Sequence, residues 1–584
     1  MNITKVSVHN FRSIKAISFE LDKYMCIVGP NNSGKSNLVN ALRIFYDDAK
    51  YNETIDFPKF NIDDDDNESW IEIEYKLSDD EFNTLKDDYK GQNNVLKVRK
   101  YLKSNQKDKV KNNQSNIYAY ENGNLSNNLF YGAKNISEAK LGNIIYIPEL
   151  TTTDENLKLT GPSPLREIIS FVMNKVVKNS SSFNNLTESF KEFNEKFRNE
   201  ASNDGYSLEE LRKDINESLK EWEIEFKLDI NSVKPEDIIK NLVSHYTIDK
   251  NLNKEIEIKY LGQGLQRHII YTLLKLSSKY KDIKKSEKKD FSPDFTLILF
   301  EEPEAFLHPN QQELLNYSLR DLSFEEGQQV IITTHSPIFV SKNIEEINSI
   351  IKFKREEGKT QCYQITNQLK SNLFSENNNL IKRLEQKKDD NNIDDNTKKR
   401  IIELIGDTYY KQRLEEESIR YLLWLDSERC SAFFADIVLI CEGATEKVFI
   451  DYLIKNKWNE LKEKRIYVLD AMGKFNIHRY MNLFNHLGIY HSVLADKDEN
   501  KNIHEIINEF ITKNKNNFTI KIDFFDKDIE SFLGIEPPER KDKKPLCIMW
   551  NYFNQEISED KIETLKSKIE NLVTQEEGTW TDKT

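Results

Sequence analysis

The stretch MCIVGPNNSGKSNLVNALRIFY, residues 25–46, decides the fold of the first half of this chain. An apolar run typical of a buried strand is followed by a glycine-containing loop, and then by apolar residues at helical spacing. The loop fits the pattern G-x-x-x-x-G-K-[ST], whose backbone N–H groups curl around phosphates. We therefore expect Lys35 on the outer phosphates of a nucleotide and the Ser36 hydroxyl on a magnesium ion, and a glycine-rich turn without ligand is the alternative. The predicted binding residues of this loop are Gly29, Asn31, Asn32, Ser33, Gly34, Lys35 and Ser36.

A second motif, LILFEEPEAFLHP at residues 297–309, supplies paired acids. Its apolar run predicts a buried strand that ends at Glu301 and Glu302, beside the phosphates. We expect Glu301 to hold the magnesium ion and Glu302 to polarise an attacking water. Two solvated acids at a strand end are the alternative. His335 follows the buried run QQVIITT, where an imidazole can reach a γ-phosphate, although a lone His is often structural.

A third motif, LGQGLQR at residues 261–267, places two glycines at the start of a predicted helix, another anion site. Together and in this order the motifs resemble the ABC-type ATPase head, in which ATP is sandwiched between two heads. The resemblance implies that Gly262, Gly264 and Gln266 serve the nucleotide of a partner subunit, so the protein is expected to be at least a dimer. HNFRSIK and EEPEAFLHP resemble the branch that contains SMC, RecF and overcoming-lysogenisation-defect (OLD) proteins.

The segment IVLICEGATEKVFIDYLI, residues 437–454, begins a second chemistry. Glu442 lies at the end of a predicted strand, and Glu446 lies one turn into the following helix. A later strand, HSVLAD, ends at Asp496 and is followed by Asp498. Convergent carboxylates suit one or two magnesium ions, which can cleave a phosphodiester. Each motif alone is more often a solvated surface.

This arrangement resembles the Toprim domain of topoisomerases, primases and OLD-family nucleases. The resemblance implies that Glu442, Asp496 and Asp498 bind magnesium or manganese, with Glu446 as the extra acid of the nuclease branch. OLD nucleases also carry a late acidic motif and a lysine before a proline. The resemblance implies Asp528 and Glu530 as further metal ligands. It implies Lys544, with Lys543 equally available, as the lysine that stabilises charge on the scissile phosphate.

The resemblance implies an α/β protein, with an ABC-type ATPase head of mixed sheet and helices that carries a helical insertion. A C-terminal, Rossmann-like Toprim domain follows. The expected boundaries are 1–163 and 251–365 for the head, 164–250 for a helical dimerisation element, 366–430 for a helical linker and 431–584 for Toprim.

The implied function is that of an ATP-hydrolysing, metal-dependent DNA endonuclease or nickase. OLD-like proteins include phage-defence effectors of the Gabija and retron-associated kinds, so a helicase or a retron reverse transcriptase with its RNA–DNA product would be a partner. Two alternatives remain. One is a RecF- or SMC-like repair clamp without nuclease activity, and the other is a nucleotide-sensing head that controls a partner toxin.

Composition sets further bounds. With 584 residues the chain is too long to fold around a single hydrophobic core, so several domains are expected. Its net charge of −14 argues against a DNA-coating protein. DNA contacts should therefore come from local basic clusters at 97–111, 275–289 or 540–544, although such runs are usually solvated faces. The Asn- and Lys-rich residues 91–126 are expected to form a solvated hairpin or loop. Scattered cysteines and the lack of a long apolar run predict a cytoplasmic protein.

Overall fold

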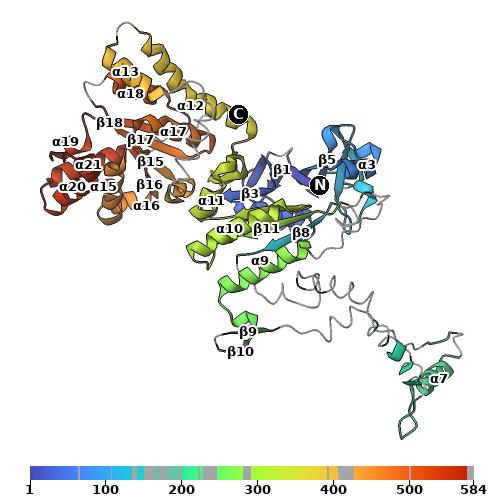
Figure 1. Cartoon of the computed structure of the whole chain (residues 1–584). Helices are drawn as coiled ribbons and strands as arrows, with labels where there is room; N and C mark the ends of the chain where they lie inside the picture. The colour runs from blue at the N-terminus through green and yellow to red at the C-terminus, as the bar shows by residue number, and fades with distance from the viewer. Residues whose placement is uncertain are drawn as a thin grey trace. The chain divides into compact units, whose positions relative to one another are not determined.

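The structure is a computed structural model of the chain (Figure 1). It divides into two compact units, residues 1–149 with 288–584, and residues 150–287. The residues that it describes are 1–63, 66–106, 108–134, 141–149, 200–220, 224–227, 246–250, 252–279, 291, 293–390, 393–405, 427–498 and 502–574, with isolated positions between 165 and 197.

The first sheet of the larger unit has six antiparallel strands in the order β2-β1-β4-β5-β6-β7. These strands are β1 (Asn2–Phe11), β2 (Ile14–Glu20), β4 (Ser69–Lys76), β5 (Val95–Lys103), β6 (Ile117–Glu121) and β7 (Asn124–Leu129). Of the prediction of a solvated hairpin or loop over 91–126, the hairpin is confirmed, because β5 and β6 pair antiparallel, and the solvation is wrong. Leu96 and Val98 on β5 are fully buried, and Lys100 on the same face is buried with them. The basic residues of this segment made it look solvated throughout, although one face of the strand is buried.

The second sheet is mixed and holds the nucleotide motifs, in the order β14-β13-β3-β12-β11-β8. Its strands are β3 (Tyr24–Val28), β8 (Asn143–Ile147), β11 (Thr296–Glu301), β12 (Gln328–Thr333), β13 (Ile350–Glu356) and β14 (Lys359–Gln364). All neighbours pair in parallel except β14, which forms an antiparallel hairpin with β13. The predicted order of strand, loop and helix is confirmed, because β3 leads through the loop into α1 (Lys35–Phe45). The carboxyl ends of β3, β11 and β12 therefore share one edge.

The third sheet is fully parallel, in the order β16-β15-β17-β18, and forms the part of the chain for which a Toprim domain is predicted, called the Toprim part below. Its strands are β15 (Ile437–Cys441), β16 (Ile466–Asp470), β17 (Tyr490–Asp496) and β18 (Thr519–Phe525). Helices α15 (Ala444–Asn456), α17 (Ile477–His486), α18 (Asn502–Lys513) and α21 (Glu559–Val573) accompany it. Since β15 and β17 are neighbours, their carboxyl ends place Glu442 and Asp496 next to each other.

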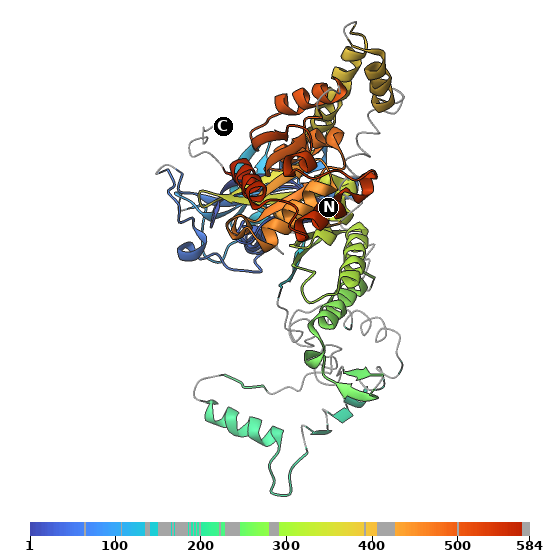
Figure 2. The same ribbon diagram turned by 90° about the vertical axis from the view of Figure 1, so that its left-hand side faces the viewer.

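Helices α12 (Asn367–Lys388) and α13 (Asp395–Ile405) confirm the helical prediction for the described part of 366–430. They pack together with α18 at one end of the larger unit (Figure 2). In the smaller unit the structure describes α7 (Leu208–Ser218), a short hairpin of β9 (Thr247–Asp249) and β10 (Lys254–Ile256), and α9 (Gln263–Lys279). Most of the predicted dimerisation element lies outside the described residues, and the domain boundaries stay predictions. Among the helices that the structure describes, none has the length and apolar character needed to cross a bilayer.

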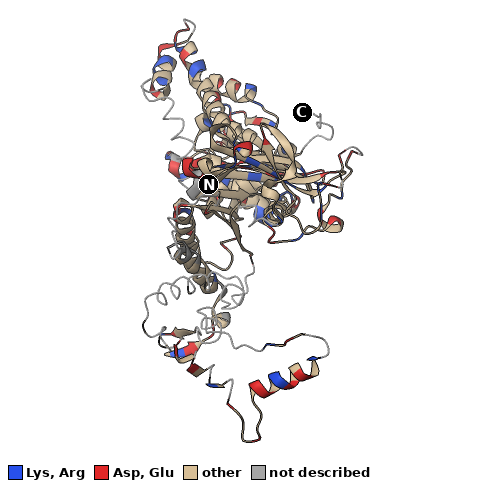
Figure 3. Ribbon diagram, turned by 90° about the vertical axis from the view of Figure 1, so that its right-hand side faces the viewer, with Lys and Arg blue, Asp and Glu red and all other residues tan. Residues whose placement is uncertain are grey.

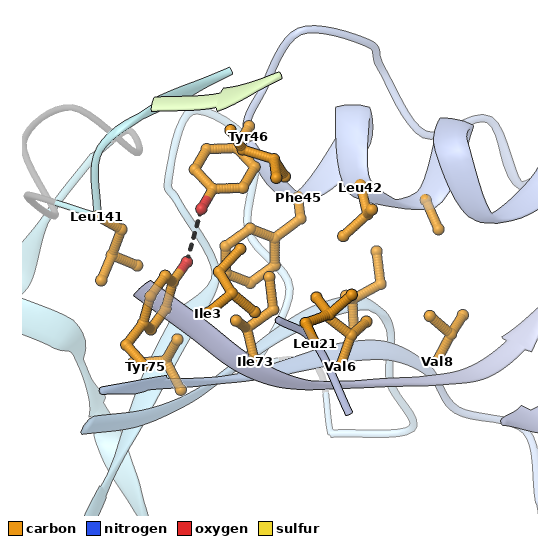
Figure 4. Packing of buried hydrophobic residues seen from close by; sticks show 14 of the residues in the cluster. Ile3, Val6, Val8, Leu21, Leu42, Phe45, Tyr46, Ile73, Tyr75 and Leu141 are labelled. Carbon is orange, nitrogen blue, oxygen red and sulfur yellow. Dashed lines mark hydrogen bonds between the residues drawn. The ribbon is translucent and has the colours of Figure 1, made fainter. Parts of the chain in front are cut away.

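The core of the head lies between its first sheet, the β3 sheet and α1 (Figure 4). Leu42 and Phe45 of α1 pack with Val6 of β1 and Ile73 of β4, all of them buried. Within this apolar cluster the hydroxyls of Tyr46 and Tyr75 form a hydrogen bond of 2.9 Å. The bond satisfies two polar groups that burial would otherwise leave without water.

We expect this pair to behave as a unit in a double-mutant cycle. Tyr75→Phe leaves the Tyr46 hydroxyl buried without its partner, which costs about 1–3 kcal/mol of unfolding free energy. Tyr46→Phe has the same effect, whereas the double variant should lose much less than the sum of the two. Urea denaturation of the head transition measures all four proteins. Additive losses would contradict the pairing.

Candidate nucleotide and metal sites

Two glycines shape the phosphate-binding loop after β3. Gly29 has φ of +149° and Gly34 has φ of +103°, conformations that L side chains rarely adopt. A Cβ atom at Gly29 would lie 2.2 Å from the Phe353 carbonyl oxygen, and one at Gly34 would lie 2.2 Å from Thr360 Oγ1. Both contacts come from the β13–β14 hairpin. The loop therefore needs glycine for its own turn and for the close approach of this hairpin.

Lys35 is held inside the loop. Its Nζ donates hydrogen bonds to the carbonyl oxygens of Gly29 at 3.0 Å and Pro30 at 3.1 Å. Burial lowers the pKa of Lys35 to about 8, against the opposing charges of Glu302, Glu304 and Glu301. An incoming phosphate would restore a full counter-charge. The ammonium is thus placed for an anionic ligand.

The structure brings most of the predicted nucleotide residues around one cleft of about 260 Å³. The cleft is lined by Asn31, Asn32, Ser33, Gly34, Lys35, Ser36, Asn37, Glu302, Thr333 and His335. Of the other predicted residues, Gly29 and Glu301 lie close to this lining in sequence without being part of it. Gly262, Gly264 and Gln266 belong to the smaller unit, where Gln266 Nε2 donates to the Leu261 carbonyl oxygen at 2.7 Å. The structure therefore joins two of the three motifs in one cleft.

The acids after β11 differ in their surroundings. Glu301 accepts a hydrogen bond from the Tyr146 hydroxyl. Glu302 has φ of +43°, and its Oε1 lies 3.4 Å from Nε2 of His335. Burial, together with the charge of Lys35, lowers the pKa of His335 to about 4, so this contact joins a carboxylate to a neutral imidazole. Burial and the nearby Glu149 raise the pKa of Glu302, which suits a group that accepts a proton.

Glu304 is a third acid that the sequence analysis did not single out. It accepts hydrogen bonds from Thr334 Oγ1 at 2.8 Å and from the backbone N–H of His335 at 2.6 Å and of Ser336 at 3.1 Å. Burial raises the pKa of this carboxyl. Glu304 thus holds the loop after β12 and places His335 near Glu302. The signal was present as the last acid of EEPE, which follows the strand at a turn.

In the Toprim part, two predicted acids meet where β15 and β17 end. The backbone N–H of Asp496 donates to Glu442 Oε2 at 3.3 Å. Glu446, buried in the first turn of α15, accepts a hydrogen bond from the Gly443 N–H at 3.2 Å. Burial, with the charges of Glu446, Glu442 and Asp498, raises the pKa of Asp496 to about 9. Burial and the neighbouring carboxylates also raise the pKa of Glu446 to about 7.

Lys474 is another site residue that the sequence analysis did not single out. Its side chain is buried, and its Nζ donates to the Asp496 carbonyl oxygen and to Asp498 Oδ2, the latter at 2.8 Å. The same ammonium lies 3.6 Å from Glu442 Oε2. Asp498 has φ of +52° and also contacts His504 Nδ1 at 3.0 Å. Lys474 follows β16, the other neighbour of β15, so its place was readable only once the strand order was known.

The late acidic motif lies on α19 (Ile529–Leu533) and the helix α20 (Lys544–Phe553). Lys544 Nζ lies 3.0 Å from Oε1 of the buried Glu530, while Lys543 is exposed. The charges of Glu530, Asp528 and Asp496 raise the pKa of Lys544 against its partial burial. Asp528 caps α19 by accepting a hydrogen bond from the Ser531 N–H at 2.8 Å. The geometry thus distinguishes Lys544 from Lys543 and gives Asp528 a structural role.

The donor set fits a hard divalent cation. All the predicted ligands are carboxylates, and Asp496 Oδ1 is buried without a hydrogen-bond partner. Across the described residues, no three His, Cys, Asp or Glu side chains form a ready ligand cluster. The ammonium of Lys474 lies 2.8 Å from Asp498 Oδ2 and 3.6 Å from Glu442 Oε2, between two of these acids. A magnesium or manganese ion would be held by Glu442, Asp496 and their neighbours.

The β13–β14 hairpin also contacts the Toprim part. Lys352 is fully buried and donates to the Phe433 carbonyl oxygen at 2.5 Å. Lys354 Nζ lies 3.5 Å from the ring centre of Tyr490 on β17. Tyr363 packs so closely that a Cβ atom at Gly488 would lie 2.5 Å from its ring. One hairpin therefore supports the phosphate loop and the Toprim sheet together.

Replacing Asp496 should stabilise the metal-free protein. Its pKa is raised in the folded state, so folding binds a proton that the unfolded chain releases, and stability falls as pH rises from about 4 to about 9. Asp496→Asn removes this loss, and we expect a melting temperature several degrees higher in chelator at pH 8. Manganese should stabilise the wild type and leave the variant unchanged. Asp389→Asn, an exposed position, is the control; a variant less stable than wild type in chelator would refute the electrostatic argument.

Replacing Lys474 should have the opposite effect. Lys474→Met leaves Glu442, Asp496 and Asp498 without their buried cation, and loss of one buried partner costs about 3–5 kcal/mol. We expect a lower melting temperature in chelator, with partial recovery when manganese is added. The double variant with Asp496→Asn should also recover stability. Equal melting of Lys474→Met and the wild type would show that the ammonium does not balance these acids.

Both the ATPase head and the Toprim part are similar to known protein families. The protein-family model for the AAA ATPase domain matches residues 1–340, and that for the overcoming lysogenization defect protein-like TOPRIM domain matches residues 433–498. The Old nuclease of Escherichia phage P2 is 23% identical over 522 residues, which cover 86% of this chain and 78% of that protein. Endonuclease GajA of Bacillus cereus strain HuB5-5 is 25% identical over 325 residues, which cover 53% of this chain and 42% of that protein. GajA of strain VD045 is 22% identical over 523 residues, with coverages of 85% and 75%.

These matches confirm the predicted resemblance and the α/β fold class, an ATPase head of mixed sheet and helices followed by a Toprim domain. Strands β15, β16 and β17 of the parallel sheet lie within the TOPRIM match, and β18 follows after its end. The nucleotide loop and the acids after β11 lie within the ATPase match. The chain belongs to the AAA ATPase domain family and carries an OLD-like TOPRIM domain.

Proposed function

We propose that this protein is an ATP-hydrolysing, metal-dependent DNA endonuclease or nickase that acts in antiphage defence. The observation that carries the proposal is the meeting of Glu442 and Asp496 at adjacent strand ends, with Glu446 buried beside them. A repair clamp would have no need of buried acids whose repulsion raises their pKa. The similarity to Old nuclease and Endonuclease GajA also supports a nuclease.

In the head, the loop 29–36 binds the ATP phosphates. Ser36 and Glu301 hold the magnesium ion that accompanies ATP, and Lys35 neutralises the outer phosphates. Glu302 accepts a proton from the attacking water, and the neutral imidazole of His335 positions it. Gly262, Gly264 and Gln266 serve the nucleotide of a second copy, which makes the protein at least a dimer.

In the Toprim part, Glu442, Asp496 and Asp498 hold magnesium or manganese, and the buried acids Glu446 and Glu530 complete the acidic site. A bound divalent cation supplies an acidified water and stabilises the leaving oxygen of the phosphodiester. Lys544 stabilises charge on the scissile phosphate, because it is the half-buried lysine that reaches Glu530. Asp528 caps the start of α19 and so helps to hold Glu530, which α19 carries, in this site. A cytoplasmic location, and a helicase or a reverse transcriptase with its RNA–DNA product as partner, belong to the same proposal.

Cleavage of supercoiled plasmid with magnesium or manganese, with and without ATP, tests this function. We expect nicked or linear product from the wild type and none above buffer from Glu442→Ala. Lys35→Ala should lose ATP hydrolysis while cleavage survives or changes in its response to ATP. Glu463→Ala, an exposed acid of the same domain, should cleave as the wild type does.

Two results would count against the proposal. Equal cleavage by Glu442→Ala and the wild type would place the activity elsewhere. No cleavage by the wild type, with either metal and with the products of neighbouring genes added, would favour a clamp whose acids are idle.

A further inference from the structure

A groove between α12 and α18 gathers positive charge close to the Toprim acids. Lys382 and Arg383 of α12 and Lys513 of α18 line it, with uncharged Asn379, Gln386 and Phe510 among the other lining residues. The groove holds about 350 Å³, and no carboxylate lines it. This is unusual for a chain whose net charge is −14. We call it the α12–α18 groove; lysines and arginines on these helices are blue in Figure 3.

Helix α18 connects this groove to the metal site. His504, in its first turn, lies 3.0 Å from Asp498, and Lys513 is its last residue. At 1.5 Å per residue these two positions are about 14 Å apart along the helix. Along a DNA strand, one phosphate follows another every 3.4 Å of helix axis, so the distance corresponds to about four nucleotides. A strand cut at the acids can therefore reach the groove.

Several cations of the basic clusters predicted from sequence have acidic partners within the fold. Lys97 and Arg99 of β5 lie 2.8 and 2.7 Å from Glu72, and Lys100 pairs with Asp47. In the 540–544 cluster, Lys544 pairs with the buried Glu530 at 3.0 Å, whereas Arg540 pairs with Asp542 at 2.7 Å on the exposed surface, where such a pair contributes little. The 275–289 cluster lies mostly outside the described residues.

The cations of the α12–α18 groove are less engaged in ion pairs than those of the sequence clusters. Lys382 and Lys513 are exposed, and neither has an ion-pair partner among the residues that the structure describes. Arg383 pairs at 2.7 Å with Glu509, whose side chain is 62% exposed, and such exposed pairs contribute little. The side-chain amides of Asn379 and Gln386 add hydrogen-bond donors of the kind that contact phosphates.

We propose that the α12–α18 groove binds the sugar–phosphate backbone of the DNA on which the Toprim site acts. The inference rests on the proposed nuclease function and names where its substrate lies. Cations and amides without a base-reading element predict binding that is indifferent to sequence and steep in salt. DNA would run from the acids along α18 to Lys513 and Lys382.

The test is the salt dependence of DNA binding by the full-length protein. We would measure the fluorescence anisotropy of a labelled 30-base-pair duplex between 50 and 300 mM salt, with calcium in place of magnesium to suppress cleavage. Each lost phosphate contact lowers the slope of log K against log salt by about 0.9. Lys382→Ala/Lys513→Ala should thus lose about 1.8 from the slope and bind more weakly.

A matched control carries the same change in net charge on the same domain. Lys455→Ala/Lys561→Ala removes two exposed lysines of α15 and α21 and should keep the wild-type slope. Circular dichroism and melting would show that all proteins are folded. Equal slopes for the groove variant, the control and the wild type would overturn the inference.

Plasmid cleavage by the same proteins separates the two proposals. If the wild type cleaves and the groove variant keeps its slope, only the groove assignment fails. If the wild type neither cleaves nor binds the duplex, the nuclease function fails and the groove assignment fails with it. Reduced cleavage by the groove variant that recovers at low salt would support both, because weaker backbone binding is restored when fewer counterions compete.

Discussion

The close approach of the β13–β14 hairpin to the phosphate-binding loop is the constraint on which much of this structure depends. Phe353 and Thr360 of the hairpin leave no room for a Cβ atom at Gly29 or Gly34. The same hairpin reaches the Toprim part through Lys352, which donates to Phe433. Because packed interiors transmit small displacements, a shift of the hairpin disturbs the nucleotide cleft and the Toprim sheet together.

The Toprim acids show a second constraint, the concentration of like charge in a buried place. Adjacent parallel strands bring Glu442 and Asp496 together, and burial then makes their repulsion costly. One lysine offsets part of this repulsion from the end of a third strand. The arrangement is unfavourable for the fold by itself and favourable for binding a cation, which is the usual conflict between stability and function at such sites.

The sequence was informative wherever function depends on contiguous residues. The phosphate loop, the acids after β11 and the acids after β15 and β17 were all predicted from short motifs at strand ends. The burial of β5 was missed because Lys97, Arg99 and Lys100 find their partners on β4 and after α1, far away in the chain. Lys474 was missed for a related reason: its neighbours are set by the strand order, which no local pattern contains. The role of the β13–β14 hairpin was likewise missed, because it depends on contacts with the phosphate loop and the Toprim part, which are distant in sequence.

The parallel pairing of β8 with β11 has a consequence for how such proteins diversify. Asn143 lies opposite Thr296, so the chain leaves the sheet and returns to the neighbouring position after a long excursion. The entropic cost of a longer connection rises by only about 0.6 kcal/mol for each doubling of its length. Segments before Gly262 can therefore be exchanged for modules of other sizes without altering the sheet. The connection between β8 and β11 is therefore a position where evolution can insert a new module, and where a sensor domain can be engineered into the enzyme.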